Sequence, residues 1–414
     1  MIYWYTFLYV IIFFLAVPWL VAGIIFSKRF RENLHERISV YPGYKKDKLR
    51  NTKKKLWIHA ASVGEVKLIR TLPNLLNRSD VLITCLTPEG RHQARKIFKK
   101  ATVVLIPLDI TFLYKKLLSY VNPGKLIIME TELWPGLIYS ASEMDTIILN
   151  GRLSVKKFPV YKIFRGFISN MLNRIEAIYP KDRTNRNRYL NLGISAAKIK
   201  EPLNLKYIFN IPGDKSEQLR DNRFHLPDNP VLVCGSTHSG EEKIILEVYS
   251  KIRCKFKNLS LIISPRHLNR VSRVIKLIEK YNFKPNLWSK KNKKINPGEV
   301  VIVDTIGELE KIYSLASVAF VGGSLIPHGG QNVIEPAIYK TPVVIGPYYH
   351  NFKDIVLDLK ETGGISVVNS KLEFRRNIAK ILSNPRQYSK RGNRLYQNLM
   401  QKRRLNMNKL GKIL

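Results

Sequence analysis

Residues 56–66 read Leu56-Trp57-Ile58-His59-Ala60-Ala61-Ser62-Val63-Gly64-Glu65-Val66, an apolar run that passes through a small turn into a helical pattern. A nearly continuous apolar run followed by a turn and a helix is typical of a parallel strand that is buried on both faces. Gly64 permits a tight turn, and we expect Glu65 in the first turn of a helix that begins near Val66. The same order of strand, turn and helix recurs along the chain, and this recurrence predicts the fold.

The apolar runs form two series, and helical patterns such as Val66–Asn77 and Thr111–Val121 separate the runs of the first. The first series comprises Leu56–Ala61, Val81–Leu86, Thr102–Pro107, Lys125–Met129, Thr146–Leu149 and Ala177–Tyr179. The second comprises Val231–Cys234, Ser260–Ser264, Val300–Asp304, Val318–Val321, Val343–Gly346 and Ile365–Val368. A polar connection, Tyr207–Pro230, lies between them. We therefore expect an α/β protein with two Rossmann-like domains that face a cleft.

The length and composition agree with this architecture. A chain of 414 residues is too long for one ordinary core, and 45% hydrophobic residues exclude a disordered chain. The three cysteines are scattered without metal-ligand spacing, which argues against a disulfide scaffold and favours a reducing cytoplasm.

The net charge of +39 indicates an anionic partner. The alternative is that it reflects only a Lys-rich composition. Nucleic acid, an anionic membrane surface and a phosphorylated substrate would each be an anionic partner. A membrane-tethered nucleic-acid-binding protein is therefore one alternative. However, the chain has no recognisable RNA- or DNA-binding motif, so we expect no nucleic acid partner.

The N-terminus predicts a membrane anchor. Residues 1–27 carry no charge, are mostly apolar and are followed directly by Lys28, Arg29 and Arg31. Such a stretch is long enough to span or insert deeply, and the basic flank places the rest of the chain in the cytoplasm. A cleaved signal peptide is disfavoured because a basic n-region and a small-residue cleavage site are missing.

These patterns give five segments: residues 1–27 as anchor, 28–50 as basic connector, 51–207 and 208–385 as the two domains, and 386–414 as a basic C-terminal helix. The last segment has no acidic residue and is amphipathic. It either contacts anionic lipid or packs back on the N-terminal domain with a solvated basic face, and we favour the packing.

In the first domain, carboxylates follow two predicted strands. Glu65 follows the first strand, where it is either a catalytic group or a carboxylate that complements the helix dipole. Glu130 and Glu132 follow the strand Lys125–Met129. Because an unpaired buried carboxylate is costly, we expect at least one of this pair to serve the site.

In the second domain, four strand ends are suited to anions. They are Gly235–Glu242, Ser264–His267, Asp304–Glu308 and Gly322–Pro336. The small residues and amides of the first can cradle an anion, Arg266 can capture a phosphate, and the glycines of the last allow a ligand to approach the backbone. No Asp-x-Asp metal motif, Walker loop, Gly-x-Ser-x-Gly elbow or Cys/His metal cluster occurs, and four anion-compatible strand ends in one domain indicate a nucleotide.

The order of these motifs resembles a known family. Trp57–Glu65, Met129–Pro135, Gly235–Glu242, Ser264–His267 and Gly322–Pro336, with Gly346-Pro347 and Asn351-Phe352, are similar to the segments of 3-deoxy-D-manno-octulosonic acid (Kdo) transferases. These are membrane-anchored glycosyltransferases of the lipopolysaccharide core. The resemblance extends from the anchor to about Ile365.

The resemblance implies a GT-B fold with an N-terminal anchor helix in the cell inner membrane and the catalytic domains on its cytoplasmic side. It further implies CMP-Kdo as donor substrate, a lipid A precursor (lipid IVA) as acceptor, the anionic membrane surface as partner, and no cofactor or metal. A GT-B enzyme that uses another nucleotide sugar is the alternative.

The resemblance also implies roles for individual residues. Glu65 matches the general base of an inverting transfer, and Glu130 and Lys206 match positions that stabilise the transition state. The positions that match CMP-binding segments are Pro265, Arg266, Ile306, Gly307, Glu308, Asn332, Val333, Ile334 and Glu335. Two positions depart from the family pattern: Leu203 stands where Gly is usual, and Gln331 stands where His is common.

Overall fold

The computed structural model describes residues 34–50, 56–130, 132–211, 229–290 and 295–413. The chain divides into two compact units, one of residues up to Phe209 together with Asn406–Leu414, the other of Asn210–Leu405. Most of the polar connection that the sequence suggests between the domains lies outside the described residues.

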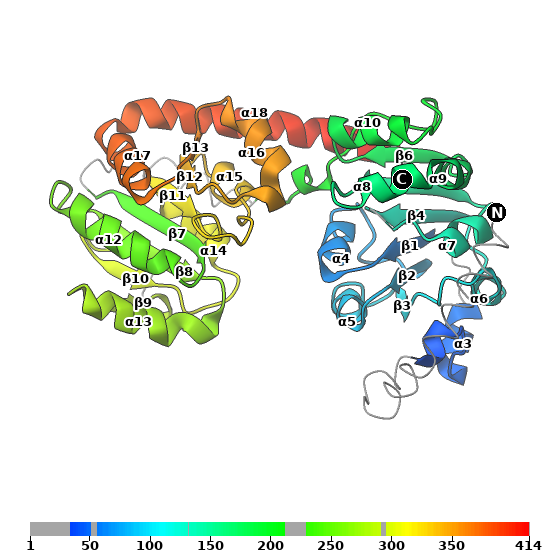
Figure 1. Ribbon diagram of the computed structural model, residues 1–414. Helices are drawn as coiled ribbons and strands as arrows, with labels where there is room; N and C mark the ends of the chain where they lie inside the picture. Colours follow the sequence, from blue (N-terminus) through cyan, green and yellow to red (C-terminus); the bar gives the residue numbers. More distant parts are fainter. Residues whose placement is uncertain (1–33, 51–55, 131, 212–228, 291–294, 414) are drawn as a thin grey trace. The chain divides into compact units, whose positions relative to one another are not determined.

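The first unit contains a six-stranded parallel sheet in the order β3-β2-β1-β4-β5-β6 (Figure 1). Its strands are β1 (Leu56–Ala60), β2 (Val81–Cys85), β3 (Thr102–Leu105), β4 (Lys125–Met129), β5 (Asp145–Gly151) and β6 (Ala177–Pro180). Each of the six apolar runs of the first series forms a strand, as predicted.

Helices cover both faces of this sheet. They are α3 (Gly43–Arg50), α4 (Val63–Ile69), α5 (Pro88–Ile97), α6 (Thr111–Leu118), α7 (Pro135–Ser140), α8 (Phe158–Ile163), α9 (Arg165–Leu172) and α10 (Arg183–Asn191), with a 3₁₀ turn η1 (Leu205–Tyr207). Apolar side chains of α4 and α5 pack on one face, and those of α6, α7 and α9 pack on the other (Figure 1).

One helix differs from its prediction. The pattern over Val66–Asn77 predicts a helix of that extent, but α4 begins at Val63 and ends at Ile69. Ser62 caps the helix, because its side chain accepts a hydrogen bond from the Glu65 amide. Pro73, which has no amide hydrogen, disfavours helical backbone just before it and ends the pattern early.

The second unit contains a seven-stranded parallel sheet in the order β13-β12-β11-β7-β8-β10-β9. Its strands are β7 (Val231–Thr237), β8 (Ser260–Pro265), β9 (Pro285–Leu287), β10 (Val300–Ile302), β11 (Val318–Val321), β12 (Val343–Ile345) and β13 (Ile365–Val367). The six runs of the second series are all strands. The short edge strand β9 is an addition that the sequence did not predict.

The helices of the second unit are α12 (Glu241–Arg253), α13 (Val271–Lys280), α14 (Leu309–Ile312), α15 (Ile334–Ile338), α16 (Lys353–Lys360), α17 (Lys371–Ser383) and α18 (Pro385–Gly411). The 3₁₀ turns are η2 (Leu268–Arg270), η3 (Trp288–Lys290), η4 (Tyr313–Leu315) and η5 (His350–Phe352). Helices α12, α13 and α17 share one apolar cluster with the strands.

Each sheet has a point where the strand order reverses direction. In the first unit it lies between β1 and β4, and in the second between β7 and β11. In open parallel sheets, ligands bind beyond the carboxyl ends of the strands at this switch point. The loops that follow these four strands are therefore where a functional site is expected.

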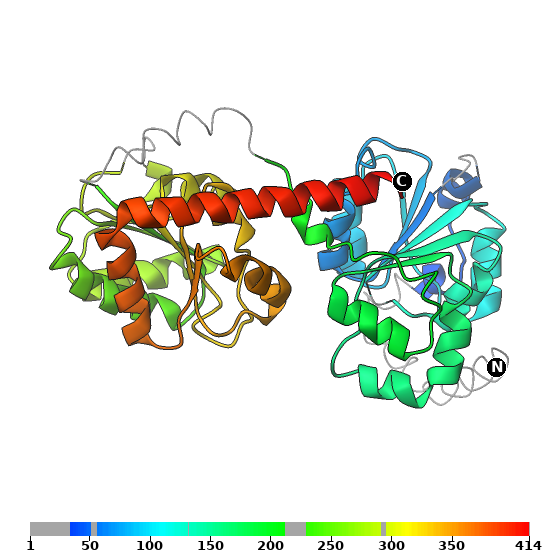
Figure 2. The ribbon, with the colours of Figure 1, turned by 90° about the horizontal axis from the view of Figure 1, so that it is seen from above.

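The C-terminal helix α18 is 27 residues long (Figure 2). Its last part belongs to the first unit, where Leu410 and Ile413 are buried in one cluster with Leu203 and Leu205. The end of the predicted segment 386–414 thus packs on the first unit, as the sequence favours, whereas its larger part, up to Leu405, belongs to the second unit.

The predicted anchor, residues 1–27, lies outside the described residues. Among the helices that are described, none combines the length and apolarity needed to cross a membrane.

Candidate functional site

Glu65 lies at the carboxyl end of β1, in the first turn of α4. Its Oε2 accepts a hydrogen bond from the Ala61 amide at 2.7 Å, and its Oε1 accepts one from the Ser62 hydroxyl at 3.2 Å. Only 8% of the residue is exposed. The turn thus holds the carboxyl group at the switch point of the first sheet, while a carboxylate can accept more hydrogen bonds than these two.

Burial raises the pKa of Glu65 to about 8. The Ala61 hydrogen bond opposes this shift, whereas the negative charges of Glu132 and Glu130 add to it. The structure therefore brings these three acids close enough to interact. A carboxyl group whose pKa lies near neutrality is suited to accept a proton from a hydroxyl group at physiological pH.

Glu130 and Glu132 follow β4 on the other side of the switch point. Glu130 has φ = 53°, and its Oε1 accepts a hydrogen bond from Asn150 Nδ2 at 3.1 Å. Glu132 accepts a hydrogen bond from the Trp134 indole at 2.6 Å, and its Oε2 lies 3.8 Å from His59 Nε2. Burial raises the pKa of Glu132, but His59 and Trp134 more than offset it, so that carboxyl group stays ionised.

Asn150 connects Glu130 to the segment that carries Lys206. While its Nδ2 binds Glu130, its Oδ1 accepts a hydrogen bond from the Leu205 amide at 3.3 Å. Asn150 is fully buried and has φ = 57°, a left-handed conformation that Asn tolerates better than most residues. Asn150 was not predicted from the sequence, although an Asn-Gly pair at the end of a strand indicates a turn with left-handed backbone.

Lys206 lies in η1, and its amide donates a hydrogen bond to Asn204 Oδ1 at 3.1 Å. Asn204 is itself held by Asn406, whose Oδ1 accepts the Asn204 amide hydrogen at 2.8 Å. Leu203, the departure from the family pattern, is buried, and its amide donates to Pro180 O at 2.8 Å. Its φ is not in the left-handed region, so this backbone does not require glycine.

In the second unit, Arg266 and Glu335 follow two strands and interact electrostatically. Arg266 follows β8 and is exposed, and the preceding Pro265 is the last residue of that strand. Burial raises the pKa of Glu335 to about 7, while the Asn332 hydrogen bond and the positive charge of Arg266 lower it. At that pKa the Glu335 carboxyl group can both donate and accept hydrogen bonds near neutral pH, as pairing with sugar hydroxyls requires.

The segment Asn332–Glu335 offers a ligand two polar side chains. Asn332 Nδ2 donates to Glu335 Oε1 at 3.1 Å, and Asn332 Oδ1 accepts from the Ile334 amide at 3.1 Å. The side chains of Val333 and Ile334 are buried in the core, so their contribution to binding is restricted to the backbone.

The segment Ile306–Glu308 follows β10. The Ile306 side chain is 85% exposed, and Gly307 has φ = 87° with open space where a Cβ atom would lie. The Trp288 indole donates a hydrogen bond to Glu308. An exposed apolar side chain beside an unobstructed glycine is suited to cover a planar ring.

Three amides at the start of the glycine-rich turn after β11 already have an internal partner. The carboxylate of Glu241 accepts hydrogen bonds from the amides of Gly323, Ser324 and Leu325, at 2.7, 3.0 and 3.0 Å, and from the His238 amide at 2.9 Å. These amides are therefore already bound to an internal carboxylate, and one of them, that of His238, lies in the segment Gly235–Glu242 for which the sequence predicts an anion cradle. The glycines serve close packing instead: a Cβ on Gly322 would lie 2.4 Å from Ser236 O.

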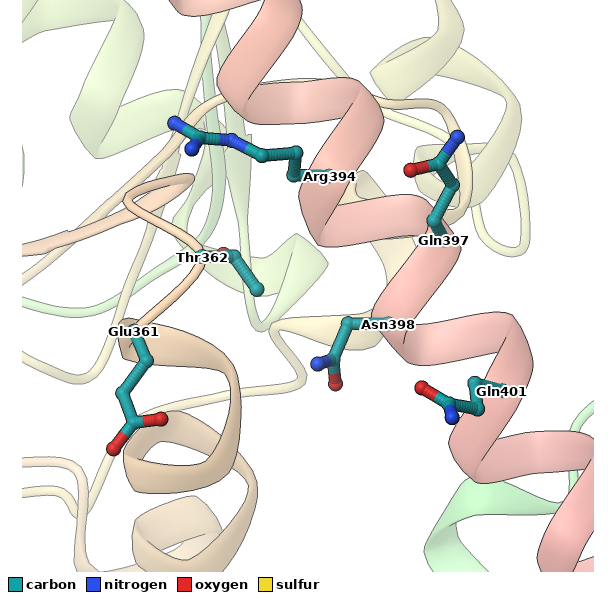
Figure 3. Close-up of a pocket in the computed structure, with 6 residues that line it drawn as sticks. All are labelled: Glu361, Thr362, Arg394, Gln397, Asn398 and Gln401. Atoms are coloured by element: carbon teal, nitrogen blue, oxygen red, sulfur yellow. The ribbon is translucent and has the colours of Figure 1, made fainter.

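A cavity of about 350 Å³ lies elsewhere in the second unit, between the end of α16 and α18 (Figure 3). It is lined by Glu361, Thr362, Arg394, Gln397, Asn398 and Gln401. None of the predicted site residues is among them. Across the described ranges, no group of three or more His, Cys, Asp or Glu side chains is arranged to hold a metal ion.

Comparisons with known proteins assign the family. A family model described as 3-Deoxy-D-manno-octulosonic-acid transferase (kdotransferase) matches residues 32–209. A 3-deoxy-D-manno-octulosonic acid transferase of Haemophilus influenzae is 32% identical over 386 residues, 91% of this chain and 90% of the relative. Another of the same name, from Chlamydophila psittaci, is 27% identical over 371 residues, 87% of this chain and 84% of the relative.

Among solved structures, Anabaena Alr3699/HepE in complex with UDP has a TM-score of 0.55 at 11% identity, covering 87% of this chain and 99% of its own. That likeness concerns the fold alone, which is the two-domain fold of GT-B glycosyltransferases. The chain belongs to the Kdo transferase family. It is therefore a Kdo glycosyltransferase of lipopolysaccharide biosynthesis, as the motifs predicted.

Proposed function

We propose that this enzyme transfers Kdo from CMP-Kdo to a lipid A precursor, lipid IVA, in an inverting reaction that needs no metal ion, with release of CMP. The observation that carries the proposal is Glu65, a buried carboxyl group with a pKa near 8 at the switch point of the first sheet. Membership of the Kdo transferase family supports Kdo as the sugar that is transferred.

Glu65 acts as general base in this proposal. A hydroxyl group of the acceptor attacks the anomeric carbon of Kdo, and its proton passes to the Glu65 carboxylate. The bond between that carbon and the phosphate oxygen breaks at the same time, and CMP leaves with the electron pair. The charges of Glu130 and Glu132 raise the proton affinity of Glu65 and so favour this transfer.

Cations of the chain stabilise the departing phosphate. Arg266 holds the phosphate of CMP-Kdo in the second unit, and Glu335 with Asn332 binds hydroxyl groups of the nucleotide. Lys206, in η1 of the first unit, matches a family position that stabilises the transition state. A leaving group with a single phosphate needs only one or two such cations, which is why no metal is invoked.

The acceptor explains the charge of the chain and its N-terminal sequence. Lipid IVA is a phosphorylated lipid of the cytoplasmic leaflet, so its reactive hydroxyl group stays near the membrane surface. We place the enzyme at the cytoplasmic side of the inner membrane, held by residues 1–27 and by the attraction between its +39 charge and anionic lipids. Tethering raises the effective concentration of the acceptor.

The test is mass spectrometry of lipid IVA after incubation with the purified full-length protein and CMP-Kdo, with and without a chelator. We expect the mass of at least one Kdo residue to be added in both reactions. A parallel incubation replaces CMP-Kdo with UDP-sugars. Transfer from a UDP-sugar alone would establish a different donor, and loss of transfer with chelator would overturn metal independence.

A further inference from the structure

Three histidines surround the switch point of the second sheet, and the proposed reaction leaves them without a role. His238 follows β7, His328 lies in the loop after β11, and His267 follows β8. The strands β7 and β11 are neighbours in the sheet that lead in opposite directions from the switch point. Two of the imidazoles therefore come from the two loops where a ligand of such a sheet is expected.

The three rings lie against one another. The His238 and His328 rings are stacked, with centroids 4.4 Å apart and planes at 16°, and the His267 ring meets His238 edge-on at 6.0 Å. Gln331 Nε2 lies 3.4 Å from His238 Nε2. His267 and His328 are exposed and His238 is partly buried, so the cluster is open to a ligand.

One buried carboxylate fixes the two loops relative to each other. Glu241 accepts hydrogen bonds from the His238 amide and from the amides of Gly323, Ser324 and Leu325, which precede His328. Those bonds occupy the amides of Gly323, Ser324 and Leu325, which are therefore not available to an anion. The imidazoles on the same two loops can donate hydrogen bonds to an anion instead.

The charged neighbours of the cluster are mainly cationic. Burial lowers the pKa of His238, and His328, His267, Arg270 and Arg266 lower it further. The acids on the adjoining elements are already bound: Glu241 by the backbone amides, and Glu242 by Arg270 at 2.8 and 3.0 Å. An incoming anion would therefore meet a positive potential and raise the proton affinity of the imidazoles.

We infer that His238, His267 and His328 form the subsite for the carboxylate of the acidic donor sugar. This inference rests on the proposed function. An ulosonic acid carries its carboxylate on the anomeric carbon, which in CMP-Kdo also carries the phosphate, so the donor presents two anionic groups side by side. Arg266 takes the phosphate, and the adjacent imidazoles, beginning with His267, take the carboxylate.

The experiment compares binding of CMP-Kdo with binding of CMP, which lacks the sugar carboxylate. We use calorimetry on the full-length protein and on His328→Ala, a change at an exposed residue. Losing one charge-assisted hydrogen bond should weaken CMP-Kdo binding about tenfold to a hundredfold. CMP binding should change less than about threefold, and wild type should prefer CMP-Kdo to CMP.

His238→Gln is the second variant, and it keeps a hydrogen-bond donor but cannot be protonated. In wild type, the preference for CMP-Kdo should decline as the pH rises from about 6 to about 8, and in this variant the decline should be smaller, because only His267 and His328 can still be protonated. His92→Gln, an exposed imidazole of the first unit, is the control and should behave as wild type.

Equal weakening of CMP and CMP-Kdo would assign the histidines to the nucleotide and overturn the inference. So would wild-type protein that binds both ligands equally. A protein that prefers CMP-Kdo but transfers nothing to lipid IVA would refute the proposed reaction while leaving the subsite intact, so the two failures are distinguishable.

Discussion

The switch points of the two sheets share a topology and differ in chemistry. Beyond β1 and β4 lie Glu65, Glu130 and Glu132, and beyond β7 and β11 lie His238 and His328, with Arg266 nearby. Both sets stand at the carboxyl ends of parallel strands. The fold therefore places the candidate ligand site of each unit at the same point of its sheet, and the side chains differ: under the proposed function the acidic set accepts a proton, whereas the basic set holds an anion.

A second contrast lies between two buried carboxylates, Glu241 and the proposed base Glu65. Glu241 and Glu65 are both buried at the first turn of a helix. Glu241 accepts hydrogen bonds from four backbone amides, whereas Glu65 accepts them from one amide and one hydroxyl. A carboxylate saturated by the backbone holds a loop in place, but one with unused lone pairs can take a proton from a substrate.

The largest expected effect is that of Glu65→Gln. Loss of a general base typically lowers the rate about 10²–10⁴-fold, so we expect kcat to fall by that order while CMP binding in the other unit is unchanged. The matched control is Glu89→Gln in the first turn of α5, which removes a similar dipole interaction from an exposed position. A Glu65→Gln enzyme with kcat within a few-fold of wild type would move the base to Glu130.

The same variant has a pH signature. Because the pKa of Glu65 is raised from 4.5 to about 8 in the folded state, its contribution to stability is complete below about pH 4.5 and is lost as the pH rises through about 8. Glu65→Gln should therefore gain thermal stability relative to wild type between about pH 6 and pH 9. Wild-type kcat should rise over this range as the base ionises.

Arg266→Ala tests the proposed anion-binding site of the second unit. Loss of a charge-assisted contact to the phosphate should cost about 1.5–3 kcal/mol of CMP binding, measured by calorimetry. Arg273→Ala, an exposed arginine on α13, is the control. Unchanged CMP affinity in a folded Arg266→Ala protein would remove Arg266 from the site.

Asn150 offers a test of how the acidic side is held together. Asn150→Ala leaves the buried Leu205 amide without that acceptor and places Ala at φ = 57°, and we expect a loss of about 1–3 kcal/mol in urea unfolding. Asn150→Gly tolerates the left-handed backbone conformation, so its loss of stability reports the lost hydrogen bonds alone. Asn150→Asp keeps an acceptor for Leu205 but sets a carboxylate against Glu130, so it should lower kcat. Unchanged kcat in all three would exclude a positioning role.

The twelve apolar runs and the family motifs predicted both sheets, because buried parallel strands leave a strong apolar signal. The strand β9 was not predicted, because it begins with Pro285, contains Asn286 and lies at the edge of the sheet. The role of Glu241 could not be predicted, because its partners Gly323–Leu325 are distant in sequence. The His238–His328 stack depends on strand order in the same way, since only β7–β11 pairing brings the two rings together.

The smallest effect is expected at Asn406, near the end of α18. Its Oδ1 accepts the Asn204 amide hydrogen at 2.8 Å, and Asn204 in turn caps the turn that carries Lys206. Asn406→Ala should cost about 1 kcal/mol, the usual net value of one hydrogen bond, and should lower kcat a few-fold without changing CMP affinity. Asn408→Ala, an exposed asparagine on the same helix, is the matched control. If stability falls and kcat is unchanged, the C-terminal segment only closes the core around Leu203 and Leu205. If kcat falls as well, Asn406 also positions the turn that carries Lys206.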